Sequence, residues 1–317
     1  MYDSCMTSLP AAVFKSPFSK RKNITPKLSF LPLAVCLLLS FGADPAPACT
    51  LFAAAGSRVE GGGTLIAKNR DRPPRLSVLE VRTPPDGYRY LALVAADLAH
   101  KPAVAGINEK GLVVVGATAG SLANKDESGA KGLTQTLLKQ CATVDEVLAR
   151  RELLRAAAPV FQALADGRKI AVIEVAPQGR VALKVTDQGT LCHTNHYLDP
   201  QFQEYNQKPN ISSLVRYCRI DRLLSLQIRP FTLEDFLACS QDRHDGPDNS
   251  IWRTGSAAAK ARTLATWIVA QLPGAAPHLY IVLANPDEPQ KILNLKLEPS
   301  LWKKGLNDKI FTLDGDR

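Results

Sequence analysis

The sequence predicts an α+β domain whose sheets carry helices on their outer faces. Short apolar and β-branched runs form strand segments, and two other blocks have apolar residues spaced near 3.6. These segments follow the order strands, helices, strands, helices, strands, which suits a layered α+β domain. No internal repeat or low-complexity linker divides residues 49–317, and an apolar fraction of 45% is sufficient for one sizeable core.

The first part of this domain has the pattern of β structure. Strands are expected at 49–55, 64–68, 76–83 and 88–96. Gly61, Gly62 and Gly63 are expected to form the tight turn before the second strand. Neither Gly-Lys-Ser/Thr nor a helical pattern follows these glycines, which excludes a phosphate loop. Residues 103–120 have the pattern of a hairpin, in which Gly111 takes the positive φ that the loop requires.

Helices and strands then alternate to the end of the chain. Helices are expected at 133–142, 143–154, 212–226 and 232–240. Thr143 is expected to be an N-cap, with Glu146 three residues on, and Ser212 is a candidate N-cap of the third helix. The remaining strands are expected at 158–166, 169–176, 180–187, 190–195, 262–272 and 278–286.

Residues 1–48 have the pattern of a cleavable signal peptide. Basic residues between Lys15 and Lys27 precede an apolar run, and Ala46-Pro47-Ala48 has the A-x-A form of a processing site. The apolar run is shorter than the roughly 20 residues that a spanning helix needs. We therefore expect an exported mature chain, residues 49–317, that is periplasmic or extracellular and keeps no membrane span. An uncleaved anchor is the alternative.

A cysteine at a processing site has a second interpretation. Bacterial lipoproteins are cut just before a cysteine that is then lipidated, and their processing site normally has Leu three positions before it. Here that position is Ala46. A lipid-anchored envelope or binding protein, attached through Cys49, is therefore the alternative to an enzyme. The two exclude each other, because lipidation consumes both the amine and the thiol.

Composition and charge argue against several other classes of protein. The net charge of +9 is spread out, and no Lys/Arg cluster is interleaved with aromatic residues, so no nucleic-acid partner is expected. The seven cysteines include no CxxC pair. The acidic segment 242–249 lacks the EF-hand spacing and is expected to be a loop. We expect neither a metal nor a cofactor. Nothing in the sequence indicates an oligomeric state.

If the chain is cut before Cys49, one residue carries a free thiol and a free amine. A thiol has a pKa of about 8.5 and a terminal amine a pKa of about 7.7–8.0, so the amine can take the thiol proton at neutral pH. One residue then supplies both nucleophile and base, and attack on an amide forms an acyl-thioester. Such a site also needs donors that face the oxyanion and a fixed charge that orients the amine.

Three polar segments provide candidates for these roles. Residues 68–71 follow a strand, where alternation places Lys68 and Arg70 on one face and Asn69 and Asp71 on the other. A solvated strand end is the alternative there. Asn195 lies in a polar segment whose alternative interpretation is a turn. Arg216 and Arg219, three apart on a helix, could equally form a solvated face.

Taken in order, these segments resemble a known family. The quoted motifs are "CTLF", "GGTLIAKNRD", "GINEKGLVVVG", "LCHTNHY" and "SSLVRYCR", from Cys49 to about Arg219. They are similar to the N-terminal-nucleophile amidases of the choloylglycine hydrolase and penicillin acyltransferase type. The last third of the chain matches more loosely, in its strand pattern.

The resemblance implies a four-layer αββα fold and cleavage of a linear, non-peptide amide bond in a small-molecule substrate. By position, Cys49 resembles the nucleophile and Asp71 the carboxylate that holds the terminal amine. Asn195 resembles an oxyanion-hole residue, and Arg216 resembles the buried arginine near the nucleophile. Bile-salt conjugates, acyl-homoserine lactones, β-lactam side chains and N-acyl amino acids all contain such an amide. Hydrolysis and acyl transfer differ in whether water or an amine reaches the thioester.

Two positions depart from the choloylglycine hydrolases. Lys68 stands where those enzymes usually carry Arg, which keeps the charge but loses the bidentate fork. Thr118 stands, by spacing, where they place an Asn that stabilises the oxyanion, and a threonine can donate one hydrogen bond there. Both departures favour the penicillin-acyltransferase-like branch.

Overall fold

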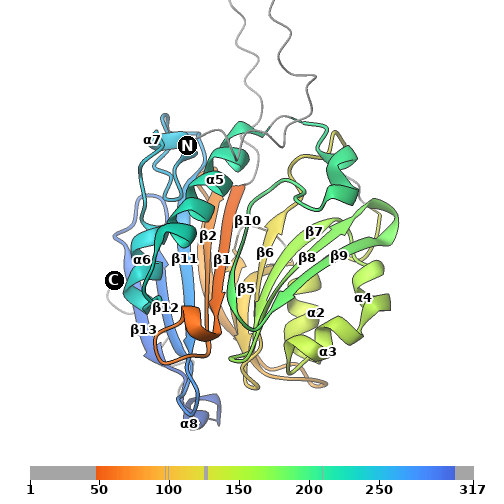
Figure 1. Ribbon diagram of the computed structural model, residues 1–317, viewed down its shortest axis with the longest axis vertical. Helices are drawn as coiled ribbons and strands as arrows, with labels where there is room; N and C mark the ends of the chain where they lie inside the picture. The colour runs from red at the N-terminus through yellow and green to blue at the C-terminus, as the bar shows by residue number, and fades with distance from the viewer. Residues whose placement is uncertain (1–47, 97, 99, 125–127, 209, 304–317) are drawn as a thin grey trace, which may run out of the picture. The chain divides into compact units, whose positions relative to one another are not determined.

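The computed structural model describes residues 48–96, 98, 100–124, 128–208 and 210–303. The expected signal peptide therefore lies outside the described residues, apart from Ala48. The described chain forms two β-sheets packed face to face, with helices on the outer face of each (Figure 1).

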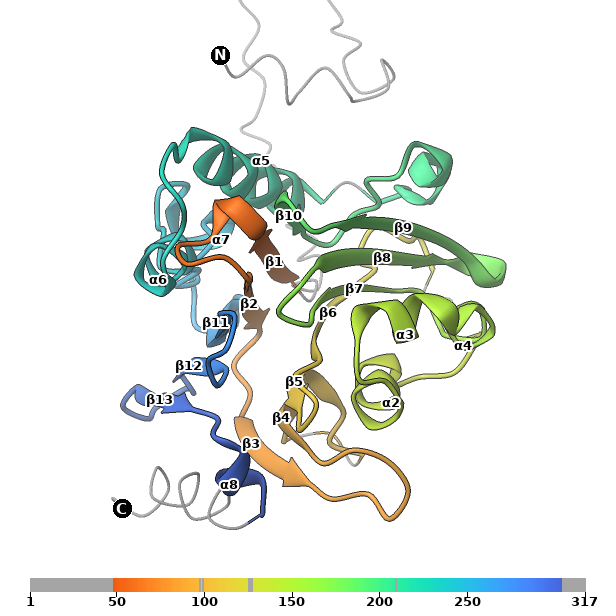
Figure 2. The same cartoon turned by 60° about the horizontal axis from the view of Figure 1, so that its bottom comes forward.

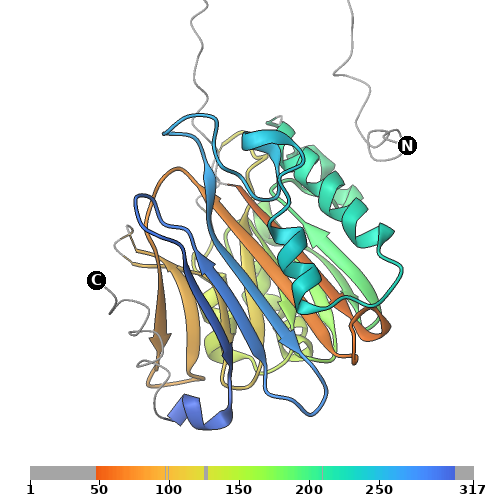
Figure 3. The ribbon, with the colours of Figure 1, turned by 90° about the vertical axis from the view of Figure 1, so that its left-hand side faces the viewer.

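The first sheet contains the start of the described chain. It has six strands in the order β10-β1-β2-β11-β12-β13, and all neighbours are antiparallel. Their bounds are β1 Ala48–Ala55, β2 Thr64–Arg72, β10 Gly189–His193, β11 Arg262–Gln271, β12 His278–Leu283 and β13 Lys291–Lys296. The helices α5 (Ile211–Leu226) and α6 (Leu233–Ser240) lie across its outer face, as Figure 3 shows.

The second sheet is an antiparallel meander of seven strands in sequence order, β3 to β9. Their bounds are β3 Ser77–Arg82, β4 Tyr90–Ala95, β5 Ala103–Asn108, β6 Val113–Thr118, β7 Val160–Ala165, β8 Ile170–Ala176 and β9 Arg180–Thr186. Three helices cover its outer face (Figure 2): α2 Leu133–Gln140, α3 Val144–Ala149 and α4 Arg151–Arg155. The expected four-layer αββα sandwich is confirmed.

Short helical elements complete the described chain. They are η1 Gly56–Arg58, η2 Pro177–Gly179, η3 Pro200–Tyr205, α7 Gly246–Asn249 and α8 Pro299–Lys303. Within the described ranges, no helix combines the length and apolarity that crossing a bilayer demands.

Successive residues of the central strands point to opposite faces of the sheet and pack in two different hydrophobic cores. In β1, Leu51 and Ala53 pack between the sheets, whereas Phe52 and Ala54 pack under α5 and α6. Both faces of this strand are buried, so it is apolar apart from Thr50 and does not alternate. A functional side chain on β1 is therefore buried on either face.

The turn between β1 and β2 depends on its glycines. Gly63 has φ of +81°, and a Cβ there would lie 2.0 Å from the carbonyl oxygen of Gln271 on β11. Any side chain would collide with that backbone, so glycine is required. This turn aligns β1 with β2 and sets the register of the site.

Most expected elements are confirmed, and four details are corrected. The N-cap of α5 is Asn210, whose side chain accepts the N–H of Ser213, so Ser212 is not the cap. Ser212 Oγ donates to Asp248 O instead. The helix expected at 143–154 is two helices, broken at Arg150, where ψ is +51°. The segment expected as a loop at 242–249 contains the single turn α7, and β13 was not expected.

Candidate active site

Cys49 is the second residue of β1 and lies between the two sheets. Its side chain is 2% exposed and belongs to the apolar cluster between the sheets. In the pairing of β1 with β2, Cys49 lies opposite Arg70 and Ala48 lies opposite Asp71. Residues 68–71 and the cysteine, distant in sequence, are therefore brought together by one strand pair.

The backbone of Cys49 is held from both sides. The chain is continuous through Ala48, so the Cys49 nitrogen is a peptide N–H, and it donates to Asn195 Oδ1 at 2.7 Å. The Cys49 carbonyl accepts a hydrogen bond from Arg216 Nη1. Arg216 also donates to Thr50 Oγ1 at 2.9 Å and to Asn195 Oδ1 at 3.0 Å. Arg216 thus ties the Cys49 backbone to Asn195.

Arg216 reaches this position because of the face that α5 buries. Ser213, Arg216, Ile220 and Leu224 recur at helical spacing and form the buried face of the helix. Burial lowers the pKa of Arg216 to about 10, while the charge of Asp71 acts in the opposite direction. Arg219 turns away and pairs with Asp242. The solvated-face alternative is wrong for Arg216.

Asp71 is buried on the face of β2 that points toward the helices. Its Oδ1 accepts a hydrogen bond from Thr263 Oγ1 on β11 at 2.8 Å. Its Oδ2 is buried and has no hydrogen-bond partner among the described residues. Burial raises the pKa of Asp71, and the nearby charges of Arg216 and Arg253 oppose that rise. The site therefore contains a buried carboxylate oxygen with unused capacity, beside the strand position of Ala48.

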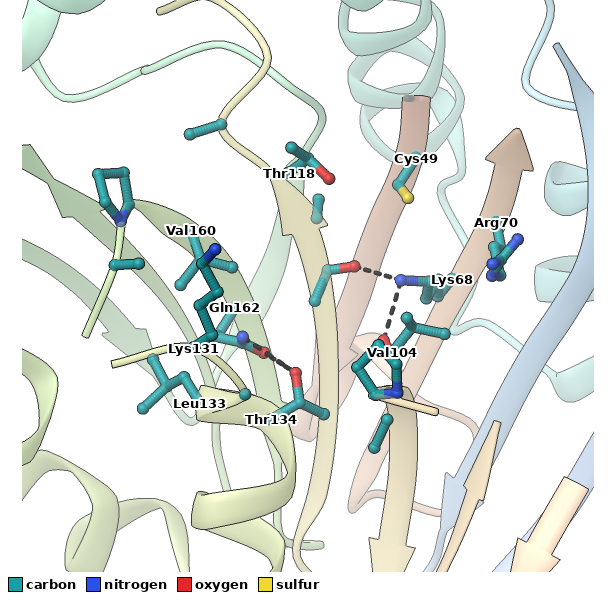
Figure 4. Close-up of a pocket in the computed structure, with 18 of the residues that line it drawn as sticks. Cys49, Lys68, Arg70, Val104, Thr118, Lys131, Leu133, Thr134, Val160 and Gln162 are labelled. Atoms are coloured by element: carbon teal, nitrogen blue, oxygen red, sulfur yellow. Dashed lines mark hydrogen bonds between the residues drawn. The ribbon is translucent and has the colours of Figure 1, made fainter. Parts of the chain in front are cut away.

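Lys68 lies on the other face of β2 and fills an opening in the second sheet. The pairing of β5 with β6 covers only Ala105–Val115, Gly106–Val114 and Ile107–Val113. Beyond it, Lys68 Nζ donates to Val104 O at 2.9 Å and to Gly116 O, as Figure 4 shows. The ammonium thus satisfies two carbonyls that have no ladder partner there.

The charge of Lys68 is perturbed by its surroundings. Burial lowers the pKa of Lys68 to about 8, and the Coulombic effect of Cys49 opposes that lowering. Arg70 lies between the same two sheets and is 2% exposed. Asn69 faces the helices and donates to Ser240 O and Ile251 O, which gives it a structural role. The solvated-strand-end alternative for 68–71 is wrong, since all four residues are buried.

Asn195 is fixed by hydrogen bonds from both its side chain and its backbone. Its Nδ2 donates to Thr118 O at 3.0 Å, while its backbone N–H donates to Ser213 Oγ at 2.7 Å. Just before it, His193 Nε2 lies 2.9 Å from Glu174 Oε1 in a buried pair. The alternative of a simple polar turn is wrong here, because Asn195 is fully buried and contacts the Cys49 backbone.

Thr118 lies at the end of β6 and lines the cavity beside the thiol. Its Oγ1 accepts a hydrogen bond from Arg72 Nη2 at 3.1 Å. The hydroxyl proton remains available as a donor toward a substrate oxygen. The structure thus places Thr118 near Cys49 and Asn195, where the spacing of the sequence put it.

A cavity of about 380 Å³ opens onto Cys49 (Figure 4). Among the described residues that line it, Lys68, Arg70, Arg72 and Lys131 are cationic and none is acidic. The other walls are mainly small or apolar side chains of β5, β6, the start of α2 and the segment before β7. This shape suits a small molecule with an apolar part.

Sequence reasoning missed several residues that complete the site. Thr263 holds Asp71, Ser213 holds Asn195, and Thr134 and Gln162 line the cavity. Thr263 is an ordinary residue of an expected strand, and only the β2–β11 register brings it to Asp71. The polar Gln162 inside an apolar strand was the one signal available.

The described residues hold no group of three or more His, Cys, Asp or Glu side chains suited to a metal ion. Cys49, Cys141, Cys192 and Cys239 are free thiols.

The two packed sheets, the helices outside them and a cysteine at the head of a central strand define an N-terminal-nucleophile hydrolase fold. The sequence pattern of the family described as acyl-coenzyme A:6-aminopenicillanic acid acyl-transferase matches residues 58–288. The chain belongs to this family. The matched segment begins after β1, so it does not include Cys49.

Solved structures give weaker likenesses. A mutant of the conjugated bile acid hydrolase from Clostridium perfringens is 14% identical, with a TM-score of 0.49 over 79% of this chain and 93% of that one. The N-acylethanolamine-hydrolyzing acid amidase ortholog of Caenorhabditis elegans is 15% identical, with a TM-score of 0.49 over 71% and 94%. No curated protein matches the chain.

Proposed function

We propose that this protein is an exported amidase that is cut before Cys49 and uses that cysteine as an N-terminal nucleophile. It would cleave a linear, non-peptide amide of a small molecule through an acyl-thioester. Family membership supports an amide-cleaving or acyl-transferring activity. We further propose that Cys49 is the nucleophile, that the chain is cut before it and that the chain is exported.

The main support for the proposal is that two oxygen acceptors suited to an ammonium group, Asn195 Oδ1 and Asp71 Oδ2, lie at the head of β1. Asn195 Oδ1 already accepts the Cys49 N–H, and the buried Asp71 Oδ2 has no partner among the described residues. A peptide N–H has one proton, whereas a liberated ammonium has three. Cutting the Ala48–Cys49 bond would therefore supply donors, and a positive charge, where the uncut chain leaves an acceptor unused.

The proposed reaction starts with the neutral amine of Cys49 taking the proton of its own thiol. The sulfur attacks the amide carbon, and the carbonyl electrons move to the oxygen. Thr118 Oγ1 and Asn195 Nδ2 would donate hydrogen bonds to that oxygen. The C–N bond then breaks, the leaving nitrogen takes the proton from the Cys49 ammonium, and a thioester remains. Water or an amine releases the acyl group and restores the thiol.

The cations around the thiol would have separate tasks. Lys68 would face the thiolate from the opening between β5 and β6. Arg216 would hold the Cys49 carbonyl and Asn195 at fixed positions, and thereby keep the strand's first residue in register. Asp71 would pair with the ammonium form of the amine.

The lipid-anchor alternative is less compatible with the geometry. The Cys49 side chain is 2% exposed and packs between the sheets. A diacylglyceryl group on this sulfur would have to lie inside the core rather than in a bilayer. Burial of the cysteine therefore favours the enzyme over the anchor.

The test uses the exported chain and its mass. The intact mass should correspond to a first residue of unmodified Cys49, without a lipid. Incubation with a panel of linear amides, from N-acyl amino acids to bile-salt conjugates, should release amine and leave an acyl adduct on Cys49. Adding a primary amine to the assay would separate hydrolysis from acyl transfer.

A matched pair of variants makes the test specific. Cys49→Ala should abolish amine release and keep the thermal unfolding transition. Cys239→Ala removes another free thiol, on α6 and outside the cavity, and should retain activity. An active Cys49→Ala chain, or a mature chain that begins elsewhere, would refute the proposal.

A further inference from the structure

The cavity at Cys49 continues across the seven-stranded sheet. Ala117, which lines it, packs between the two sheets, whereas Leu133, which also lines it, packs under the helices on the opposite face. Val104 and Gly116, whose carbonyls bind Lys68 beyond the paired part of β5 and β6, line the same cavity. The cavity thus has an inner part at the thiol and an outer part under the start of α2.

The outer part contains a polar pair in otherwise apolar surroundings. Thr134 Oγ1 lies 3.2 Å from Gln162 Oε1 and 3.1 Å from Gln162 Nε2 (Figure 4). Thr134 is 5% exposed and Gln162 is 1% exposed. Among the described residues that line the cavity, the uncharged hydroxyl and amide side chains are those of Thr118, Thr134 and Gln162.

The neighbouring strand leaves room at this pair. Gly116 of β6 lies directly opposite Gln162 of β7. A Cβ on Gly116 would lie 3.1 Å from Thr134 Oγ1 and 3.2 Å from the amide atoms of Gln162. The missing side chain keeps the polar pair open to the cavity. The carbonyl of the same glycine accepts a hydrogen bond from Lys68, so Gly116 lies next to both the pair and the ammonium.

The pair has hydrogen-bonding capacity that it does not use internally. A glutamine amide offers two N–H donors and a carbonyl acceptor, and a threonine hydroxyl is both donor and acceptor. Among the described residues, the only side-chain partner of Gln162 is the Thr134 hydroxyl. A buried amide with an unpaired donor is costly, so such groups usually have a partner. A ligand in the cavity can supply that partner.

Resting on the proposed function, we infer that Thr134 and Gln162 bind a neutral hydroxyl on the acyl part of the substrate. The pair is uncharged and can both donate and accept, which matches a hydroxyl better than a carboxylate or an ammonium. The acyl part is assigned because it stays bonded to the Cys49 sulfur, which lines the same cavity, and because the walls beside the pair are apolar. The substrate class is therefore an amide of a hydroxylated apolar acid.

The test compares decanoyl-glycine with its mono-hydroxylated isomers, in which the hydroxyl is moved along the chain. For the mature wild type, kcat/KM should be higher for at least one isomer than for the parent, by about tenfold for one buried hydrogen bond. Thr134→Val and Gln162→Met, which keep the volume, should reduce that ratio to near one. Thr136→Val makes the same change on the same helix, outside the cavity lining, and should keep the ratio.

Binding to the Cys49→Ala chain, measured by calorimetry, gives a second readout that needs no turnover. The same isomer should bind more tightly than the parent, and Thr134→Val in that background should remove the difference. Wild type that cleaves or binds no hydroxylated isomer better than the parent would overturn the inference, as would a preference that survives both substitutions. Cys49-dependent cleavage of the parent alone would leave the proposed function standing.

Discussion

The side-chain oxygen Oδ1 of Asn195 accepts the backbone N–H of Cys49 at 2.7 Å, across 146 residues of chain. The bond joins the head of the first described strand to a residue just beyond the end of β10, the edge strand beside β1. The same oxygen accepts a hydrogen bond from Arg216. A new terminal amine would thus form within an existing set of polar contacts.

Asn195→Ala should lower kcat by about 10²–10³-fold, the usual effect of removing one oxyanion donor. It should also destabilise the fold, because Arg216 Nη2 and the Thr118 carbonyl would both lose a partner. Steady-state kinetics and urea unfolding measure the two effects. Asn206→Ala, an amide that binds Tyr197 outside the cavity, is the control and should keep kcat. An unchanged kcat in Asn195→Ala would exclude its role at the oxyanion.

Lys68 should give the activity an alkaline limit. Its pKa is lowered to about 8, so the ammonium that would face the thiolate is lost as the pH rises through that value. In the wild type, kcat/KM should therefore fall above about pH 8. An arginine stays charged throughout this range, so Lys68→Arg should shift the fall to higher pH. A pH–rate profile of both chains checks this, and identical profiles would contradict it.

Lys68 should make the fold more stable as the pH rises, whereas it should make kcat/KM fall. Between about pH 8 and 10.5 the unfolded chain binds more protons at this residue than the native chain does. The contribution of Lys68 to the free energy of unfolding should therefore increase with pH across this window. The comparison is with Lys68→Met, which keeps the length and removes the titration. If the difference between the two chains stayed constant with pH, the lowered pKa would be wrong.

Asp71 should destabilise the uncut chain as the pH rises, whereas the mature chain should need it for activity. In the uncut chain, burial raises its pKa above the usual 3.8, so the native state holds the proton more tightly and stability should decrease as the pH rises above that value. Asp71→Asn should remove this decrease. In the mature chain the same substitution removes the partner of the ammonium, and kcat should fall by about a hundredfold. Unfolding curves across pH and kinetics of the mature form test each half.

The place of the Ala48–Cys49 bond predicts the order of folding and of the proposed processing. Ala48 is 3% exposed and Cys49 is 2% exposed, and both are paired within the sheet. A separate peptidase cannot reach this bond in the folded chain, so the proposed cut would have to precede the pairing of β1 or occur within the molecule. Purified, folded, uncut chain should resist added signal peptidase, while urea-unfolded chain should be cut. Equal cleavage of both would show that β1 opens readily.

The sequence alone determined every described strand except β13, the main helices and the ordered set of candidate residues. Strand and helix periods, the glycine turn before β2 and the capping pair of Thr143 and Glu146 are local features, and local physics is enough to predict them. The alternation at 68–71 correctly placed Lys68 and Asp71 on opposite faces. The family resemblance supplied the four-layer arrangement, because the segment pattern predicts helices outside the sheets but not the number of layers.

Only the tertiary structure decided which polar residues are buried and what they contact. Lys68 alone does not reveal that its ammonium closes a gap between β5 and β6, because that gap depends on where a distant strand pair ends. Thr263 reaches Asp71 through the register of β11, and Gln162 meets Thr134 because Gly116 between them has no side chain. Such contacts arise from strand register and layer packing, which depend on the whole chain, whereas the periodic signals depend only on neighbours in sequence.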